Sequence, residues 1–387
     1  MKITPKELYK RQTTLTEIGE DGQQKLLQTK LVIVGCGGLG SAAAVYLAAS
    51  GIGQIHLVDY DVVDASNLHR QVFYKTNDIG KPKAAVLANH IKAIAPFVKV
   101  SFSNSTISKR TVFDEISDYD FVLDCTDSLP IKYLLNDACV LKDKTLIYGS
   151  LYKYDGYVAS FNVKLSDENY SGNLRDAFPE ISKEAIPNCS EVGTLNTIVG
   201  IIALMQANEV LKLVLNIGKP LVNQLLIYNS LENSQFKMKL KQDDTCYSER
   251  KRRISEIFEI ENYVDLNCEV QDESLLITAK ELKKRLESFL LGGPALPAGR
   301  NVHRTMEIIS VIENIDALLP FEVTMKIPFS KFDTLISHIE RSRNIDKHKD
   351  FVIVCNKGIS SYIATQQLKE KYPTLNILSL KDGITNY

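Results

Sequence analysis

Residues 30–58 constrain the fold of this chain more than any other stretch of its sequence. The apolar run KLVIV (30–34) predicts a strand, and the glycine-rich loop after it leads into SAAAVYLAAS (41–50), which predicts a helix. A second predicted strand, QIHLVD (54–59), follows the short turn GIG. This order is typical of a βαβ unit, in which the two strands lie parallel in one sheet.

Strands and helices continue to alternate up to about residue 150. Further strands are predicted at KVSFSNS (99–105), FVLDCTD (121–127) and TLIYGSL (145–151). This alternation predicts an α/β fold with a Rossmann-like, mostly parallel sheet and helices on both of its faces. The following stretch, YKYDGYVASFNVKL (152–165), predicts paired antiparallel strands, so the sheet should gain an antiparallel extension.

Composition shifts divide the chain into three expected parts. Residues 1–242 form the domain with the glycine loop, and the polar segment 243–272, which contains the charge run ERKRR, is expected to be a linker. Residues 273–387 again alternate helices and strands, and they predict a second, small α/β domain of a size that can fold alone.

Charge and composition exclude several classes of protein. The chain has 387 residues and a formal net charge of −1, so no broad basic field predicts binding to nucleic acid or to anionic lipid. The first residues lack the apolar core of a secretory signal, and the most apolar run, IVGIIALM (198–205), is too short to span a bilayer. Seven cysteines without a CxxC pair argue against a disulfide framework. We therefore expect a cytoplasmic protein that does not bind a membrane.

The glycine loop itself predicts a nucleotide site. Gly35, Gly37 and Gly40 fill the pattern GxGxxG, and Gly38 adds a fourth glycine. Glycine lets a backbone turn tightly and approach a phosphate, and the free N–H groups at the start of the next helix favour an anion. Asp59 ends the next strand, where a carboxylate can accept hydrogen bonds from ribose hydroxyls. A tight glycine turn used only for packing is the alternative interpretation.

The neighbouring charges favour ATP over NAD. Arg70, Lys81 and Lys83 follow the second strand, where nucleotide phosphates should project. Chemistry at an α-phosphate needs such charge to stabilise phosphoryl oxygens, whereas hydride transfer needs little of it. Asp127, in DCTDS at a strand end, predicts an Mg²⁺ ligand, and its alternative role is the N-cap of a helix after Pro130.

Five motifs in order carry a resemblance to a known family. The chain resembles the adenylyltransferases of the MoeB/ThiF/HesA type, which activate small ubiquitin-like sulfur carriers and are related to ubiquitin-activating enzymes. The resemblance covers about residues 5–240 and rests on RQTTLTEIGEDGQQKL, VIVGCGGLG, DYDVVDASNLHRQ, GKPKA and DCTDS. It implies that a carrier's C-terminal Gly-Gly carboxylate attacks the α-phosphate of ATP, giving an acyl-adenylate and pyrophosphate.

The same resemblance implies roles for individual residues. Asp127 would bind Mg²⁺, and Arg11 would reach into the site of a neighbouring subunit, which implies a homodimer. The remaining nucleotide-binding residues would be Asp59 at the ribose, Asn67, Arg70 and Lys83 at the phosphates, and Asp61.

Two further points concern cysteines of the first domain. Cys189, in PNCSEVGTLNTIVG before an apolar helix, matches the family's acyl-accepting or persulfide-attacking cysteine, although a small buried residue is the alternative. Similar proteins often hold a structural zinc with two CxxC pairs. Here those positions read Asn173-Leu-Arg-Asp176 and Cys246-Tyr-Ser-Glu249, so we expect no zinc, and polar and apolar packing should replace it.

A second candidate site surrounds Cys355. This cysteine follows the strand FVIV and opens the loop CNKGISS, in which Gly358 permits tight curvature. Converging N–H groups of such a loop stabilise a thiolate or a persulfide anion. The pattern CxxGxxS resembles the active loop of rhodanese sulfurtransferases, so Cys355 would carry sulfur taken from a persulfide donor such as a cysteine desulfurase. The family's Asp-Val-Arg strand end is replaced by Ser310-Val-Ile312, and Lys357 is the loop's one cation.

The predicted function is therefore adenylation of a sulfur carrier ending in Gly-Gly, followed by sulfur transfer toward a carrier thiocarboxylate, as in molybdopterin or thiamine biosynthesis. Two alternatives stay open. In one, the second domain is a docking module without catalysis, as the missing Asp and Arg suggest. In the other, the chain is an NAD-dependent oxidoreductase, for which His69 would be a poor catalytic base.

Overall fold

The computed structural model divides the chain into two compact units, Met1–Asp265 and Leu266–Tyr387, which are described separately. The described residues are 3–167, 169–179, 193–240, 246–261, 263, 273–290, 306–312, 315, 318–345, 349–356, 358–381, 383, 384 and 387.

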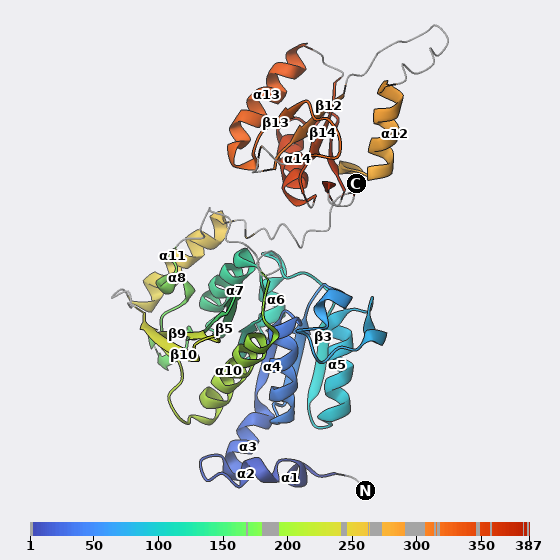
Figure 1. Ribbon diagram of the computed structural model, residues 1–387. Coiled ribbons are helices and arrows are strands. Elements are labelled where there is room, and N and C mark those ends of the chain that lie inside the picture. The colour runs from blue at the N-terminus through green and yellow to red at the C-terminus, as the bar shows by residue number, and fades with distance from the viewer. Residues whose placement is uncertain are drawn as a thin grey trace. The chain divides into compact units, whose positions relative to one another are not determined.

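The first unit, shown with its helices in Figure 1, is built on one eight-stranded sheet with the order β10-β9-β6-β5-β4-β1-β2-β3. Its parallel part consists of β1 (Lys30–Val34), β2 (Gln54–Val58), β3 (Lys99–Ser103), β4 (Phe121–Asp124) and β5 (Thr145–Tyr152). Its antiparallel extension consists of β6 (Asp155–Phe161), β9 (Gln224–Asn229) and β10 (Ser234–Lys239). A separate small hairpin pairs β7 (Lys164–Ser166) with β8 (Asn169–Tyr170).

Both faces of this sheet are covered, because its inner parallel strands are apolar on both sides. In β1, Leu31 and Ile33 enter one core, and Val32 and Val34 enter the other. The first core is closed by α3 (Gly19–Gln28), α4 (Gly38–Ala49), α5 (Lys83–Ile94) and α10 (Asn196–Leu215). The second is closed by α6 (Val112–Ile116), α7 (Leu129–Leu141) and α11 (Tyr247–Ile260), with the short α8 (Leu174–Ala177) beside α7. The expected Rossmann-like sheet with an antiparallel extension is confirmed.

Helix α10 is the one helix among the described residues that is long and apolar enough to cross a membrane by length and composition. It packs against α4, β5 and β6, and half of its apolar window is buried, including Ile198 and Ile202. The run 198–205 was predicted to be too short to span a bilayer, but it belongs to a longer helix. Packing in the core accounts for its apolar residues.

The segment expected to be a linker, 243–272, contains helix α11, which packs against α7 in the first unit. Arg250, Ile254 and Phe258 are spaced four residues apart and form its buried face. The charge run therefore lies on a helix with one covered side, and only its remaining faces are exposed.

The second unit has a five-stranded, fully parallel sheet with the order β11-β15-β14-β12-β13. On one face α13 (Phe332–Ile345) and α14 (Ile359–Lys371) contribute Leu335 and Leu368 to a core, and on the other α12 (Ala279–Leu290) contributes Leu282. The strands are β11 (Leu276–Ile277), β12 (Met306–Ser310), β13 (Met325–Lys326), β14 (Asp350–Val354) and β15 (Ile377–Leu380).

Candidate active site

The glycine loop lies at the carboxyl ends of β1 and β4, two neighbouring strands inside the parallel part of the sheet. The helix after β1, α4, packs into the core on one face, while the helix after β4, α7, packs into the core on the other. Chain segments that leave neighbouring strands toward opposite faces open a crevice between them, which is where ligands bind in open α/β sheets.

Packing inside the protein explains most of the glycines in this loop. Gly35 has a φ of +91°, and a Cβ there would lie 2.6 Å from the Cys125 carbonyl oxygen. A Cβ on Gly40 would collide with the Gly35 carbonyl, and one on Gly38 would collide with Val199 of α10. At Gly37 the nearest atom is a side-chain nitrogen of Gln71 at 3.4 Å, an ordinary contact distance.

Asp59 fixes the loop from the end of β2. Its Oδ2 accepts the backbone N–H of Cys36 at 2.6 Å, and its Oδ1 accepts that of Asp61 at 2.8 Å. Burial raises the pKa of Asp59, and the nearby Lys83 acts in the opposite direction. Each carboxylate oxygen keeps a further lone pair, so the residue can accept hydrogen bonds from a ligand while it holds the loop.

A tyrosine that the sequence did not single out completes this support. The Tyr74 hydroxyl donates a hydrogen bond to the Cys36 carbonyl at 2.6 Å and is buried. Burial, and then the charge of Asp59, raises the pKa of the Cys36 thiol well above its usual range, so this cysteine is an inert part of the core. In the sequence, the one signal for Tyr74 is its position between the motifs DYDVVDASNLHRQ and GKPKA.

Lys83 and Asp61 form an ion pair next to the loop, with Lys83 Nζ 2.7 Å from Asp61 Oδ2. The lysine side chain is 6% exposed, whereas the carboxylate is 50% exposed. The backbone N–H of Lys83 also donates to the Asp61 carbonyl at 2.9 Å. Lys81, in contrast, is exposed and pairs with Asp78.

The segment 67–71 lies along the glycine loop. The Arg70 carbonyl is next to Gly38, and the Asn67 carbonyl accepts the backbone N–H of Arg70 at 3.1 Å. Arg70 is half-buried, and its Nη1 lies 3.0 Å from His69 Nε2. The structure thus brings Asn67, Arg70, Lys83 and the loop to one edge of the sheet.

Asp127 follows β4 at the same edge, and it is exposed, with no hydrogen bond or ion pair to the residues that the structure describes. The alternative N-cap role is wrong, because the side chain of Ser128 caps α7 by accepting the N–H of Ile131. An exposed carboxylate among polar groups has the oxygen donors that Mg²⁺ prefers, so Asp127 fits that ion.

A buried ion pair that the sequence did not predict lies below this loop. Lys132 Nζ is 3.0 Å from Asp124 Oδ2 and 2.7 Å from the Gly149 carbonyl oxygen, and both side chains are almost fully buried. Asp124 Oδ1 accepts the N–H and the hydroxyl of Thr126. Burial opposes the charge of Lys132, but the attraction of Asp124 and other partners leaves its pKa raised. The pair fixes the turn that presents Asp127.

Arg11 lies away from this site in its own chain. It is exposed on α2 (Lys10–Thr13), and the next residue, Gln12, donates to the Ser50 carbonyl at the end of α4. The glycine loop lies at the other end of that 12-residue helix, which is about 18 Å long. The N-terminal helices are at the bottom of Figure 1. Cys189 lies outside the described residues.

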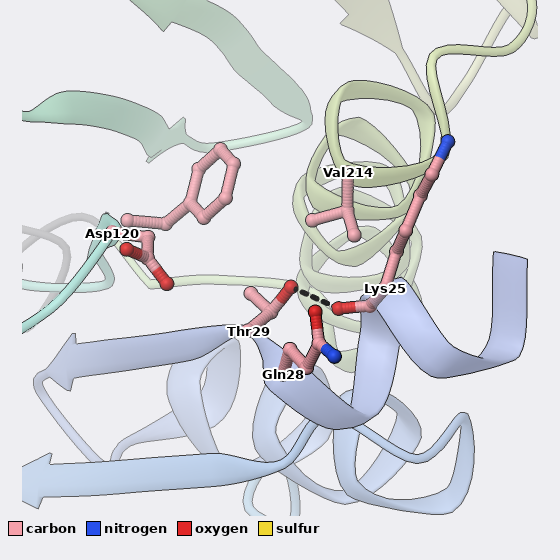
Figure 2. Close-up of a pocket in the computed structure, with 6 residues that line it drawn as sticks. Lys25, Gln28, Thr29, Asp120 and Val214 are labelled. Atoms are coloured by element: carbon pink, nitrogen blue, oxygen red, sulfur yellow. Dashed lines mark hydrogen bonds between the residues drawn. The ribbon is translucent and has the colours of Figure 1, made fainter. Parts of the chain in front are cut away.

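A shallow hollow of about 260 Å³ lies at the opposite edge of the sheet (Figure 2). Thr29 precedes β1, and Asp120 precedes β4 and accepts the N–H of Lys30. The Thr29 hydroxyl donates to the Lys25 carbonyl at 2.8 Å. This hollow is therefore not part of the crevice at the carboxyl ends of the strands.

Residues next to the positions of the family's zinc ligands make other contacts. The rings of Tyr170 and Tyr247 stack with their centroids 4.1 Å apart, and Arg250 Nη2 donates to the Tyr170 carbonyl at 3.0 Å. Arg175 pairs with the fully buried Asp137 at 2.6 Å. Among the described residues no cluster of three His, Cys, Asp or Glu side chains could hold a metal ion.

In the second unit, Cys355 follows β14, and its Sγ is buried at the start of α14. The N–H and the hydroxyl of Ser361 lie 3.3 Å and 3.2 Å from this sulfur. Gly358 has a φ of +83° and is the N-cap of the helix. The loop pattern predicted several N–H groups around the sulfur. Among the described residues, one N–H and one hydroxyl lie within hydrogen-bond distance of it, and both belong to Ser361.

Comparison with known proteins identifies the family. A family model described as the ThiF family matches residues 9–248. The chain belongs to the ThiF family. A sulfur carrier protein adenylyltransferase of Thermus thermophilus is 38% identical over 249 residues, which cover 64% of this chain and 92% of that protein. The "Probable adenylyltransferase/sulfurtransferase MoeZ" of Mycobacterium tuberculosis is 30% identical over 367 residues, which cover 94% of this chain and 88% of that one.

Solved structures agree on the fold of this ThiF-family chain. Escherichia coli MccB with MccA-N7isoASN is 22% identical, has a TM-score of 0.54, and covers 63% of this chain and 74% of its own. The structure of MccB with ATP has a TM-score of 0.50 at 23% identity, with coverages of 58% and 67%. Together with the named relatives, these findings confirm the resemblance expected from the motifs, and the chain is an enzyme of the adenylyltransferase class.

Proposed function

We propose that this enzyme uses ATP and Mg²⁺ to adenylate the C-terminal glycine of a small ubiquitin-like sulfur carrier. The observation that carries the proposal is Lys83, a nearly buried cation beside a glycine loop that begins a helix whose N-terminus has no side-chain cap. Such an N-terminus favours a phosphate. Asp59 would accept ribose hydroxyls with its free lone pairs, and Asn67, Arg70 and Lys83 would bind the phosphates. Asp127 would hold Mg²⁺, which neutralises charge on phosphate oxygens.

The adenylation step moves charge toward these cations. The carrier's terminal carboxylate attacks the α-phosphorus, the bond to the bridging oxygen breaks, and pyrophosphate leaves. Negative charge increases on the phosphoryl oxygens and the leaving group, so preorganised cations lower the barrier more than they stabilise bound ATP. We further propose a homodimer in which Arg11 acts in the partner's site, since Arg11 lies at the far end of α4 from the loop of its own chain.

The second step transfers sulfur. A Cys355 thiolate takes the terminal sulfur of a donor persulfide, and the donor leaves as a thiolate. The Cys355 persulfide then attacks the carbonyl carbon of the acyl-adenylate, and AMP leaves. A second thiolate attacks the Cys355 sulfur, so that the carrier departs as a thiocarboxylate and a disulfide remains for a dithiol reductant. Cys189 is our candidate for this second thiol from its sequence position alone. Fusion of the two units raises the effective concentration of sulfur at the adenylate.

The decisive experiment is ATP–pyrophosphate exchange with the full chain and a carrier that ends in Gly-Gly. Exchange should require the carrier, and the same carrier without its last glycine is the matched control. If a folded preparation shows no exchange with carriers of the molybdopterin and thiamine types, the proposal is wrong.

A docking role for the second unit is the competing function. Rhodaneses usually carry Asp and Arg at the strand end that Ser310 and Ile312 occupy here. Because Ser310 and Ile312 are buried and uncharged, this position favours a docking role. Cys355→Ser separates the two functions. Sulfur transfer requires that this variant lose thiocarboxylate formation with a persulfide donor while it keeps pyrophosphate exchange, whereas unchanged thiocarboxylate formation would establish docking.

A further inference from the structure

A chain of two buried hydroxyls ends at the Cys355 sulfur. The Ser379 hydroxyl, on β15, donates to Ser361 Oγ at 2.9 Å, and Ser361 Oγ lies 3.2 Å from Cys355 Sγ. Ser361 and Ser379 are completely buried, and Cys355 is 5% exposed. These contacts therefore do not compete with bulk water, and each hydroxyl has a partner inside the protein.

The donor in each contact follows from the number of protons. A serine hydroxyl carries one proton and two lone pairs. Because Ser379 gives its proton to Ser361, the proton of Ser361 stays available for the sulfur. A thiolate can only accept, so with Cys355 ionised the chain runs from Ser379 to Ser361 to Cys355. Hydrogen bonds to a charged acceptor are stronger than neutral ones, and aligned bonds polarise one another.

Strand β15 and the cysteine loop are joined in a way that keeps this chain in place. The N–H of Ile384, four residues after the end of β15, donates to the Cys355 carbonyl at 2.9 Å. β15 itself pairs with β14, the strand that leads into Cys355. Ser379 is therefore held by backbone contacts on the strand next to the loop.

We propose that Ser379 is a positioning residue for sulfur transfer, which orients the Ser361 hydroxyl so that it donates to the Cys355 thiolate. The proposal rests on the proposed role of Cys355 as the sulfur-carrying cysteine. Ser379 does not touch the sulfur and acts through Ser361. The cysteine loop contains no arginine. The hydroxyl of Ser379 therefore contributes, through Ser361, part of the stabilisation that the thiolate requires.

The test compares two substitutions of equal shape in the full chain. Ser379→Thr keeps a hydroxyl and Ser379→Val lacks it, so any effect of the extra methyl group is shared. The rate of iodoacetamide modification is measured at one fixed pH on the peptide that contains Cys355, by mass spectrometry. We expect Ser379→Thr to react about tenfold faster than Ser379→Val. Rates within twofold of one another would overturn the proposal.

A double-mutant comparison provides a second measurement in case Ser379→Thr and Ser379→Val, which have larger side chains, do not fold. Ser361→Ala and Ser379→Ala should each slow the reaction, and the double variant should be no slower than Ser361→Ala alone, because both remove one chain. Independent, multiplying effects would overturn the proposal. Ser342→Ala is the matched control, since Ser342 is a buried serine of the same unit that donates to Glu307 and should leave the rate unchanged.

This experiment needs neither a carrier nor a persulfide donor. Its failure would therefore reject the role of Ser379 and leave the adenylation and sulfur-transfer steps unaffected. Those steps are judged by pyrophosphate exchange and by the Cys355→Ser variant.

Discussion

Lys83 and Asp61 are joined twice, by an ion pair at 2.7 Å between their side chains and by a hydrogen bond at 2.9 Å between their backbones. The pair connects the first turn of α5 to the segment that follows β2. An ammonium group has three N–H donors, so Lys83 can keep Asp61 and still bind a phosphate oxygen. Asp61 thus holds a nearly buried cation in place before a nucleotide arrives.

Replacing Lys83 by methionine should lower carrier-dependent pyrophosphate exchange by about 10²–10³-fold, the usual loss on removing one preorganised donor to a developing oxyanion. Asp61→Asn should cost less, about tenfold, because the lysine remains but its partner is neutral. Lys81→Met is the matched control, as this exposed lysine of the same motif should change exchange less than about threefold. Near-normal exchange in Lys83→Met would contradict the assignment.

Asp127→Asn should increase the Mg²⁺ concentration needed for half-maximal exchange by on the order of tenfold or more, since a metal loses an anionic oxygen ligand. The measurement is exchange rate against Mg²⁺ concentration at fixed ATP. Asp120→Asn, at the other end of β4 and also exposed, should leave this dependence unchanged. If both variants raise the Mg²⁺ concentration for half-maximal exchange by a similar factor, the effect comes from net charge and Asp127 is not an Mg²⁺ ligand.

Lys132→Met should destabilise the first unit by about 3–5 kcal/mol, because Asp124 would remain buried without its counter-ion. The double variant Lys132→Met/Asp124→Asn should recover part of that loss. Urea unfolding of the single and double variants measures both quantities. An additive double variant would show that the two residues do not interact.

The contacts next to the zinc-ligand positions predict stability that does not depend on a metal. A chelator should leave the thermal unfolding midpoint unchanged, while Arg250→Met should lower the free energy of unfolding by about 1–3 kcal/mol, because the Tyr170 carbonyl loses its donor. Arg252→Met, on the exposed side of the same helix, should cost less than about 0.5 kcal/mol. A chelator-induced drop would disprove this prediction.

Alkaline pH should destabilise the first unit. Burial, and then the carboxylate of Asp143, raises the pKa of Tyr247, while burial and then Asp137 raises that of Tyr263. The folded chain therefore holds these protons more tightly than the unfolded chain, so this stability is complete below about pH 10 and is lost as the pH rises beyond it. The slope is about 1.4 kcal/mol per pH unit for each such tyrosine.

Tyr247→Phe removes one of these groups, so its free energy of unfolding should fall less steeply between about pH 10 and pH 11 than that of the natural chain. Urea titrations across this range give the slope. Tyr46→Phe, at an exposed position of the same unit, should reproduce the natural slope.

The sequence predicted the parallel sheet and the loop because both depend on local patterns. The run 30–34 is apolar on both faces, and the glycines lie where close backbone contacts require them. The pairing of Asp124 with Lys132 could not be predicted, since a polar residue in a buried position is recognised only through its partner. Helix α11 was missed for a related reason: its charged residues surround one buried face that contains Ile254 and Phe258.

The hydrogen-bonded chain from Ser379 through Ser361 to Cys355 also could not be predicted from the sequence. Ser361 lies in the loop motif, but Ser379 comes from the next strand, and only the pairing of β14 with β15 brings the two together. The motif could place the cysteine and the helix that follows it. It could not show which distant side chain completes the hydrogen bonding.

The neighbours of the four loop glycines show which of them the packing of the protein requires and which it does not. Gly35, Gly38 and Gly40 are required by the polypeptide itself, so a pseudoenzyme descended from this chain would have to keep all three after it ceased to bind a nucleotide. Gly37 alone has room for a side chain, and mutational drift would begin there. When lineages of this fold are sorted into active and inactive forms, the residue at Gly37 will therefore be more informative than an otherwise preserved glycine pattern.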